Sequence, residues 1–323
     1  MENLTLNERT LKYILSRACG SDDVSLMSQC FTLAQRTDSK VTLQHALDRG
    51  LEKSTKMKAM KCLSYALDQG ADVNQLSPQD ILGAENTSIS TREVLELLIA
   101  NGWDINSEGS GAPILWHVVN DHELVKWCLD HGADVNPSFA AAPGSRNPLK
   151  PILERAASTG NITTFELLRN NGAPLDRNFG VFPVAVMVAN ECASDATNDR
   201  DSLKRRIEML RHLLEVVGCD VNSNSFGGHY DSGSICSTPL CWIACHPSGI
   251  RVRELIWFLL DHGGDLDRTL EYTDQNNKPV VVHSARDAAT GSSWRGIPNR
   301  QFLEAVQEWE AQQRSATSSE RHH

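Results

Sequence analysis

The chain has 323 residues, of which 40% are hydrophobic and 22% are charged, and its 31 basic and 41 acidic side chains give a net charge of −10. This balance argues against the dense lysine and arginine surface that duplex DNA or an anionic membrane requires, so we expect neither as a partner. Residues 181–189 are among the longest apolar runs and are interrupted by Pro183. We therefore expect no membrane-spanning segment.

The nine cysteines are odd in number, and Cys62 and Cys128 fall on the apolar stripes of predicted helices. Disulfides are typical of secreted proteins. The first residues show no basic flank followed by an apolar run, which is the pattern of a signal peptide. We therefore expect buried, reduced thiols in a cytoplasmic or nuclear protein.

Residues 8–35 are predicted to form two helices, the first with Leu11 and Leu15 on its apolar face and the second with Met27 and Phe31. The glycine signature described below does not follow them. Terminal members of a stack are often atypical because one side faces water. We therefore interpret residues 1–36 as an N-terminal helical cap.

Residues 41–74 are predicted to form a helix that carries Leu43 and Gly50, followed by a second helix that ends before Gly70. The interval between these two glycines is longer than a minimal helical hairpin needs. We expect an extended second helix to account for it.

The segment LDHGADVN at 129–136 returns in near-copies along most of the chain. Each copy combines an apolar helix end, a glycine able to adopt the left-handed conformation at the C-cap, an aliphatic anchor and a closing Asn or Asp. The glycines of the six copies are Gly70, Gly102, Gly132, Gly172, Gly218 and Gly263. The first lie roughly 30 residues apart and the later ones are separated by insertions, which indicates a stack of helical hairpins.

The clearest copy spans residues 112–136, with Ala112-Pro113-Ile114 opening its first helix and Asn120-Asp121-His122 between its helices. Thr238-Pro239-Leu240 repeats the opening motif more closely. These motifs resemble those of the ankyrin repeat family, whose unit carries T-P-L-H-x-A on its first helix and G-A-D-V-N before a β-hairpin loop. The resemblance covers roughly residues 40–313.

The resemblance implies an all-α fold, an ankyrin-repeat solenoid of about seven helix-turn-helix units with β-hairpin loops, some of them elongated by insertions. We expect this stack to occupy residues 37–313 and a disordered tail to occupy 314–323. A polar insertion at 191–202 separates two helices, of which the second is predicted at about 203–217. The insertion at 222–237 offers Gly227-Gly228 for a tight hairpin turn.

In the family, the first helices and the hairpin tips line a concave surface, so their exposed side chains are the ones that a partner would meet. Trp116 and Trp242 fall at equivalent positions of two first helices, where the family usually has an aliphatic packing residue. Their rings belong either to the core between repeats or, as the alternative, to an aromatic wall of a binding site. The alignment places the binding groove at Trp116, Val119, Asn120, Ser158, Thr159, Asn190, Trp242, Cys245 and His246, with hairpin fingers at 138–147, 177–180, 224–236 and 272–278.

Cys236, Cys241, Cys245 and His246 approach a set of metal ligands. A structural zinc site prefers a CxxC knuckle, which this chain lacks. We therefore expect no metal and no cofactor.

Acid–base chemistry is an alternative for the region around 222–246. If the insertions at 191–202 and 222–237 closed the groove into a pocket, His246 or His229 could act as the base and Tyr230 or Asp231 as the orienting partner. A solvated hairpin whose polar groups satisfy its own backbone is the simpler interpretation. The sequence has no phosphate loop, nucleophile elbow, HExxH motif or dinucleotide fingerprint.

The leading hypothesis is a non-catalytic scaffold that binds a protein or peptide through its concave groove and hairpin fingers. The acidic surroundings would favour a basic partner. The alternative is an enzyme or small-molecule receptor with a pocket built by the two insertions. We expect the chain to be a monomer.

Overall fold

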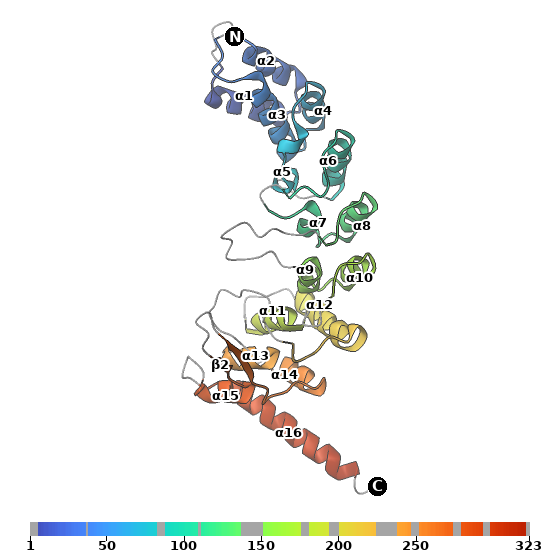
Figure 1. Cartoon of the computed structure of the whole chain (residues 1–323), viewed down its shortest axis with the longest axis vertical. Coiled ribbons are helices and arrows are strands. Elements are labelled where there is room, and N and C mark those ends of the chain that lie inside the picture. Colours follow the sequence, from blue (N-terminus) through green and yellow to red (C-terminus); the bar gives the residue numbers. More distant parts are fainter. Residues whose placement is uncertain are drawn as a thin grey trace. The chain divides into compact units, whose positions relative to one another are not determined.

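The computed structural model of the chain (Figure 1) describes residues 6–36, 38–82, 88–108, 111–136, 151–175, 181–193, 200–223, 238–246, 252–273, 279–292 and 298–320. Its contacts divide the chain into two compact units, Met1–Phe139 and Ala140–His323, called here the N-terminal and C-terminal units. The boundary between the units falls inside the predicted stack and not at its predicted start, residue 37.

The N-terminal unit is built from consecutive helical pairs, which are α1 (Glu8–Gly20) with α2 (Val24–Ala34), α3 (Leu43–Met57) with α4 (Met60–Asp68), α5 (Pro78–Leu82) with α6 (Ser88–Ala100), and α7 (Ile114–His117) with α8 (His122–Asp130). The short 3-10 helix η1 (Val73–Gln75) follows α4. First helices contact first helices, as α1 does α3, α3 does α5 and α5 does α7, while α6 contacts α8 among the second helices. The pairs therefore form a layer of first helices and a layer of second helices.

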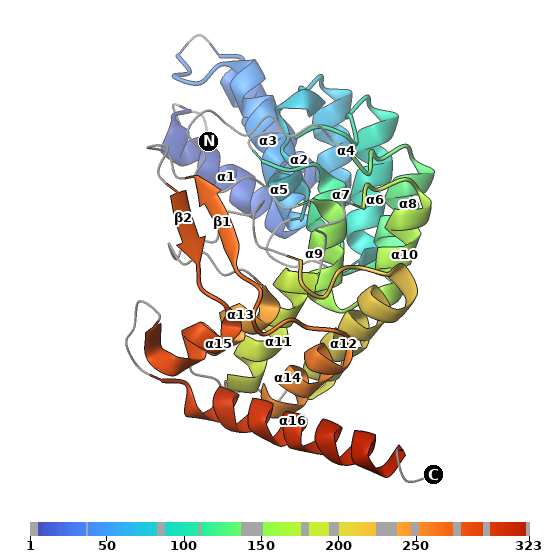
Figure 2. The same ribbon diagram turned by 60° about the horizontal axis from the view of Figure 1, so that its bottom comes forward.

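The C-terminal unit continues the pattern with α9 (Ile152–Thr159) and α10 (Ile162–Asn170), α11 (Val181–Ala193) and α12 (Arg200–Arg211), α13 (Pro239–Cys245) and α14 (Val252–Asp261), and α15 (Ala285–Asp287) and α16 (Arg300–Glu320). Two π-helical segments extend these elements, η2 (His212–Val217) after α12 and η3 (Ala288–Ser292) after α15. Helix α16 packs along α14, and α15 packs on α13 (Figure 2). The two units together contain eight pairs among the described residues, against the seven or so expected.

An antiparallel hairpin precedes α15. Strand β1 (Leu270–Thr273) pairs with β2 (Pro279–Val282), and the register runs from Leu270 opposite Val282 to Thr273 opposite Pro279. Of the finger predicted at 272–278, residues 272 and 273 lie in β1, and 274–278 lie outside the described residues. The other predicted fingers, at 138–147, 177–180 and 224–236, lie outside the described residues, as does Gly227-Gly228.

The repeated signature forms the same turn in the five copies that have an Asp two residues after the glycine. All six predicted glycines have a positive φ, between 78° and 93°. The Asp two residues after the glycine accepts a hydrogen bond from the backbone N–H two residues further on, which closes an Asx turn. Among the described residues, Asp72, Asp104, Asp134, Asp220 and Asp265 make this bond, at 2.8 to 3.0 Å.

The closing Asn of two signatures joins one turn to the next. Asn106 Nδ2 donates to the Gly132 carbonyl at 3.1 Å, and its Oδ1 accepts from the Asp134 N–H at 2.7 Å. Asn222 makes the same two bonds to Gly263 and Asp265, at 3.0 and 2.7 Å. We call this two-bond contact the asparagine clamp. It explains why the signature ends in Asn at these positions.

Helix α3 corrects the expectation for residues 41–74. The first helix of this pair is the long one, Leu43–Met57, and it runs through Gly50, whereas the second helix is only Met60–Asp68. Gly50 therefore does not end a helix. A Cβ at Gly50 would lie 2.9 Å from the Phe31 ring, so the glycine is needed for close packing of α3 on α2.

The C-terminal helix corrects a second expectation. Helix α16 extends to Glu320, so residues 314–320 of the predicted disordered tail are helical, and 321–323 lie outside the described residues. The second helix predicted at about 203–217 is present as α12 followed by η2, beginning at residue 200.

The core confirms the apolar stripes of the predicted helices. Cys62 and Cys128 are fully buried, together with Leu11, Leu15, Met27 and Phe31. Burial raises the pKa of both thiols to about 12, so they are protonated at neutral pH. These cysteines act as small packing residues.

Candidate binding surface

Trp116 and Trp242, the two tryptophans at equivalent positions of first helices, are each half-buried. The Trp116 ring meets His117 edge-on, with ring centroids 5.2 Å apart. The Trp242 ring stacks on His246, with centroids 4.0 Å apart and planes inclined by 16°. Neither ring is enclosed in the core, in contrast to Trp103 and Trp127, which are 3% and 5% exposed.

The Trp242 side chain is held from several directions. Pro239 is the first residue of helix α13, and Thr238 is its N-cap, whose hydroxyl accepts a hydrogen bond from the Cys241 N–H. Four residues later, His246 Nδ1 donates to the Trp242 carbonyl at 2.8 Å, which fixes the imidazole against the indole. Among the described residues, the indole Nε1–H of Trp242 has no hydrogen-bond partner. Its nitrogen atom is not buried. The donor therefore faces solvent.

Asn299 supports the end of α13 from the last helical pair. Its Nδ2 lies 3.2 Å from the Ile243 carbonyl, 3.2 Å from that of Ala244 and 3.0 Å from that of His246. Its Oδ1 accepts from the Phe302 N–H at the start of α16. One side chain thus joins the C-terminus of α13 to the N-terminus of α16.

The remaining predicted groove residues of the C-terminal unit differ in whether their polar groups are free to bind a partner. The Ser158 hydroxyl donates to the Glu154 carbonyl at 2.8 Å, and the Thr159 hydroxyl donates to Ala156 at 2.7 Å, so both donors are used within α9. Cys245 is half-buried. The Asn190 side chain lies outside the described residues.

In the N-terminal unit, Asn120 is exposed in the turn between α7 and α8. Val119 is 0% exposed, so its predicted place in the groove is wrong. The residue lies in the turn between α7 and α8, beyond the end of the short first helix, and its side chain is part of the core. Trp116, Val119 and Asn120 belong to the N-terminal unit, and the other predicted groove residues belong to the C-terminal unit.

The acid–base alternative stays a prediction. His229, Tyr230 and Asp231 lie outside the described residues, as does Cys236. The Cys241 thiol donates a hydrogen bond to the His283 carbonyl oxygen, with 3.2 Å between Sγ and O. Among the described side chains, no three His, Cys, Asp or Glu groups are arranged to hold a metal ion.

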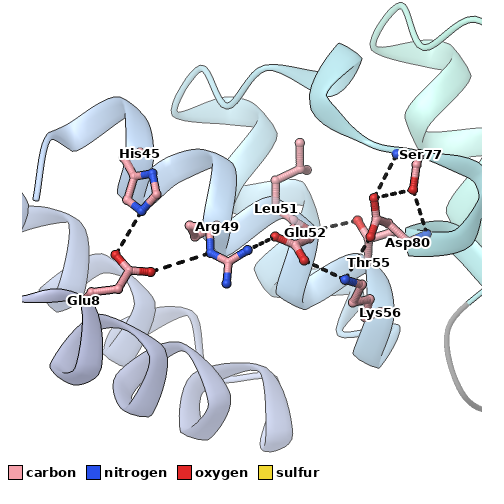
Figure 3. A network of polar contacts seen from close by, with 9 residues as sticks. All are labelled: Glu8, His45, Arg49, Leu51, Glu52, Thr55, Lys56, Ser77 and Asp80. Atoms are coloured by element: carbon pink, nitrogen blue, oxygen red, sulfur yellow. Dashed lines mark hydrogen bonds and ion pairs between the residues drawn. The ribbon is translucent and has the colours of Figure 1, made fainter. Parts of the chain in front are cut away.

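A charged network that the motif analysis missed runs over the first helices of the N-terminal unit (Figure 3). Glu8 on α1 contacts His45 at 3.0 Å and Arg49 at 4.0 Å, both on α3. Arg49 also pairs with Glu52, which pairs in turn with Lys56. The Glu52–Lys56 spacing was visible in the sequence as an i, i+4 pair. The contacts between helices were not.

The network ends on α5, where Lys56 meets Asp80 at 2.8 Å. Burial alone would raise the pKa of Asp80, but hydrogen bonds from Lys56 and Ser77 outweigh burial and hold the pKa below its ordinary value. Burial alone would lower the pKa of Lys56, and its bonds to Asp80 and Glu52 reverse that effect and raise it. The pair is therefore charged over the whole neutral range.

Asp80 should make the stability of the chain depend on pH. Because its folded pKa is lowered, its carboxylate stabilises the fold above the ordinary value near 3.8, and this contribution is lost as the pH falls through the folded pKa. We expect Asp80→Asn to lower the free energy of unfolding by about 1 kcal/mol at neutral pH, because Lys56 is partly exposed. The difference from wild type should shrink in acid. Urea unfolding at several pH values measures it, and Glu93→Gln, at an exposed site on α6, is the control. Equal loss in acid and at neutral pH would contradict this assignment.

Comparison with known proteins agrees with the repeat geometry. No protein-family model matches the chain. It is similar to the putative ankyrin repeat protein R598 of Acanthamoeba polyphaga mimivirus, with 31% identity over 93 residues. These residues are 28% of this chain and 29% of that relative. The chain therefore spans less than a third of the curated relative that it matches.

Among solved structures, the human ASB11 ankyrin repeat domain is similar at 17% sequence identity and a TM-score of 0.36, covering 90% of this chain and 96% of that chain. The paired helices and the six left-handed glycines agree with the similarity to an ankyrin repeat protein. The chain is a repeat scaffold. Among the described helices, none has both the length and the apolar composition needed to cross a bilayer.

Proposed function

We propose that the chain is a non-catalytic scaffold that binds a protein or peptide through the surface of its first helices, with Trp242 as an anchor. The observation that carries this proposal is the half-buried indole on α13, which presents a free N–H to solvent and is stacked on His246. Ankyrin repeat proteins typically bind other proteins, which supports the same reading.

The fixed geometry of Trp242 favours binding. An aromatic side chain that is already immobilised loses little conformational entropy when a partner covers it. The His246 stack holds the ring, and the Asn299 bonds hold the end of the helix that carries it. A partner would gain apolar contact on the exposed part of the ring and a hydrogen bond from Nε1.

The test is selection of peptides on the whole chain, followed by affinity measurement. A displayed library of random peptides is selected on wild type, and the enriched peptides are titrated by fluorescence anisotropy. We expect Trp242→Ala to weaken them about tenfold or more, because hot-spot tryptophans contribute about 2 kcal/mol. Trp242→Phe, which keeps a stacked ring but lacks the N–H, should fall between.

Val216→Ala is the matched control, since this residue is also apolar and 66% exposed but lies on η2 at the end of a second helix. It should bind the selected peptides as wild type does. Circular dichroism establishes that each variant is folded. Enriched peptides that bind Trp242→Ala and wild type equally would overturn the role of Trp242.

A further inference from the structure

A groove of about 240 Å³ lies between the first two first helices, α1 and α3, in the N-terminal unit. Its floor contains Leu11 and Leu15, which are 1% and 2% exposed. Its charged lining consists of four cations, Lys12, Arg49, Lys53 and Lys56, and two carboxylates, Glu8 and Glu52. The lining is therefore basic in a chain whose net charge is −10.

The two carboxylates do not neutralise all four cations. Glu8 and Glu52 are both bound by Arg49, and Glu52 also contacts Lys56, as Figure 3 shows. Lys56 has Asp80 as a further partner. The network therefore satisfies Arg49 and Lys56 and uses the acidic groups of the groove in doing so.

Lys12 and Lys53 are the two cations of the groove that this network does not pair. Lys12 is exposed and Lys53 is half-buried, and among the described residues neither forms an ion pair or hydrogen bond. The nearby Cys19 does not neutralise Lys53, because burial raises the pKa of this thiol to about 12 and keeps it protonated. Two unpaired ammonium groups thus share one groove with an apolar floor.

The volume and the charge indicate the class of occupant. Pockets for small molecules and cofactors are commonly about 300 to 1,000 Å³, so this groove is more suitable for one or two side chains than for a whole ligand. Nucleic acids and anionic membranes are bound by larger numbers of cations than two. A carboxylate beside an aliphatic side chain matches both the lysines and the leucine floor.

We propose that the groove between α1 and α3 binds an acidic peptide segment of a partner protein, with a Glu or Asp side chain between Lys12 and Lys53 and a neighbouring aliphatic side chain over Leu11 and Leu15. This site is separate from the Trp242 surface and lies in the other compact unit. It also differs from the basic partner that the overall charge favours, because the local charge at the groove has the opposite sign.

Fluorescence anisotropy with a defined probe tests this proposal. The probe is a fluorescein-labelled octapeptide of alternating glutamate and leucine, and its control has glutamine in place of glutamate. We expect wild type to bind the glutamate peptide at least about tenfold more tightly than the glutamine peptide, with affinity falling as salt screens the lysines. Equal affinity for the two peptides, or no binding of the glutamate peptide at about 1 mM, overturns the proposal.

Matched variants locate the site. The double variant Lys12→Glu with Lys53→Glu should lose at least about tenfold in affinity for the glutamate peptide, because like charges then meet in the groove. Lys126→Glu reverses an exposed charge on α8 of the same unit and should leave affinity unchanged. If the double variant is misfolded by circular dichroism, Lys12→Gln with Lys53→Gln replaces it. A loss of affinity that is equal in Lys126→Glu would overturn the assignment to this groove.

Two further measurements separate this proposal from its alternatives. Trp242→Ala should bind the glutamate peptide as wild type does. A negative result for one of the two proposed surfaces therefore does not contradict the proposal for the other. Vesicles containing about 30% phosphatidylserine test a lipid surface as the occupant. If such vesicles retain wild type but not the double variant, while the peptide fails to bind, the acidic-peptide proposal is wrong.

Discussion

Gly264→Ala is expected to destabilise the C-terminal unit by about 3 kcal/mol, because the added methyl group has no space. A Cβ at this position would lie 2.7 Å from the Leu259 carbonyl oxygen and 2.7 Å from Leu240 Cδ1. Leu240 can change rotamer, but the carbonyl belongs to the last turn of α14. The backbone must therefore move to accept alanine.

The neighbouring glycine provides the comparison. Gly263 has a φ of +84°, and a Cβ there would meet nothing within 4 Å. Gly263→Ala therefore tests only the cost of the left-handed backbone conformation, about 1 kcal/mol. Two adjacent glycines are thus required for different physical reasons, one for space and the other for conformation.

Urea unfolding of the full chain, monitored by circular dichroism, shows which of the two variants has the lower free energy of unfolding. Hydrogen exchange measured on peptides of α13 and α14 then locates the effect, since neighbouring pairs in a stack can unfold partly independently. We expect these helices to lose more protection in Gly264→Ala. A Gly264→Ala chain at least as stable as Gly263→Ala would show that the contact with Leu259 relaxes at little cost.

Asn299→Asp should destabilise the C-terminal unit by about 2 to 3 kcal/mol at neutral pH. The substitution keeps an acceptor for the Phe302 N–H at the start of α16. It replaces the Nδ2 donor with a carboxylate oxygen facing the carbonyls of Ile243, Ala244 and His246. These carbonyls form the negative end of α13, so the introduced charge is repelled.

Asn299→Ala is the matched control, because it loses both the cap and the donor but adds no charge. We expect it to cost about 1 to 2 kcal/mol, less than Asn299→Asp at neutral pH. The repelled carboxylate has a raised folded pKa, so its penalty is present above that pKa and disappears once it is protonated. Urea midpoints at pH 7 and in acid measure both effects. If Asn299→Asp remains the less stable variant after protonation, charge repulsion is not the cause.

The fold was predictable because its signature is local. Each glycine, Asp and closing Asn acts within one turn, and the positive φ of Gly132 and the Asx turn of Asp134 follow from residue type alone. The long helix of the second pair was assigned to the wrong element, because the sequence did not show that the first helix continues past Gly50 to Met57. The ring of Phe31, on which α3 packs at Gly50, is distant in sequence.

The candidate sites were only partly predictable. Alignment found the equivalent positions of Trp116 and Trp242, but sequence could not tell a packed ring from an accessible one. The His246 stack and the support from Asn299 depend on how α13 meets the last helical pair. Likewise, Lys12 and Lys53 belong to no motif, and their groove arises from the register of α1 against α3.

The asparagine clamp has a consequence for how such a chain can evolve. Asn106 and Asn222 bind only main-chain atoms of the following turn. The asparagine clamp between neighbouring helical pairs therefore does not depend on most side chains of the following pair. A helical pair can be duplicated, lost or changed in sequence without loss of the asparagine clamp, as long as the turn keeps its shape. The surface of the first helices can then acquire a new binding specificity while the packing between pairs is kept.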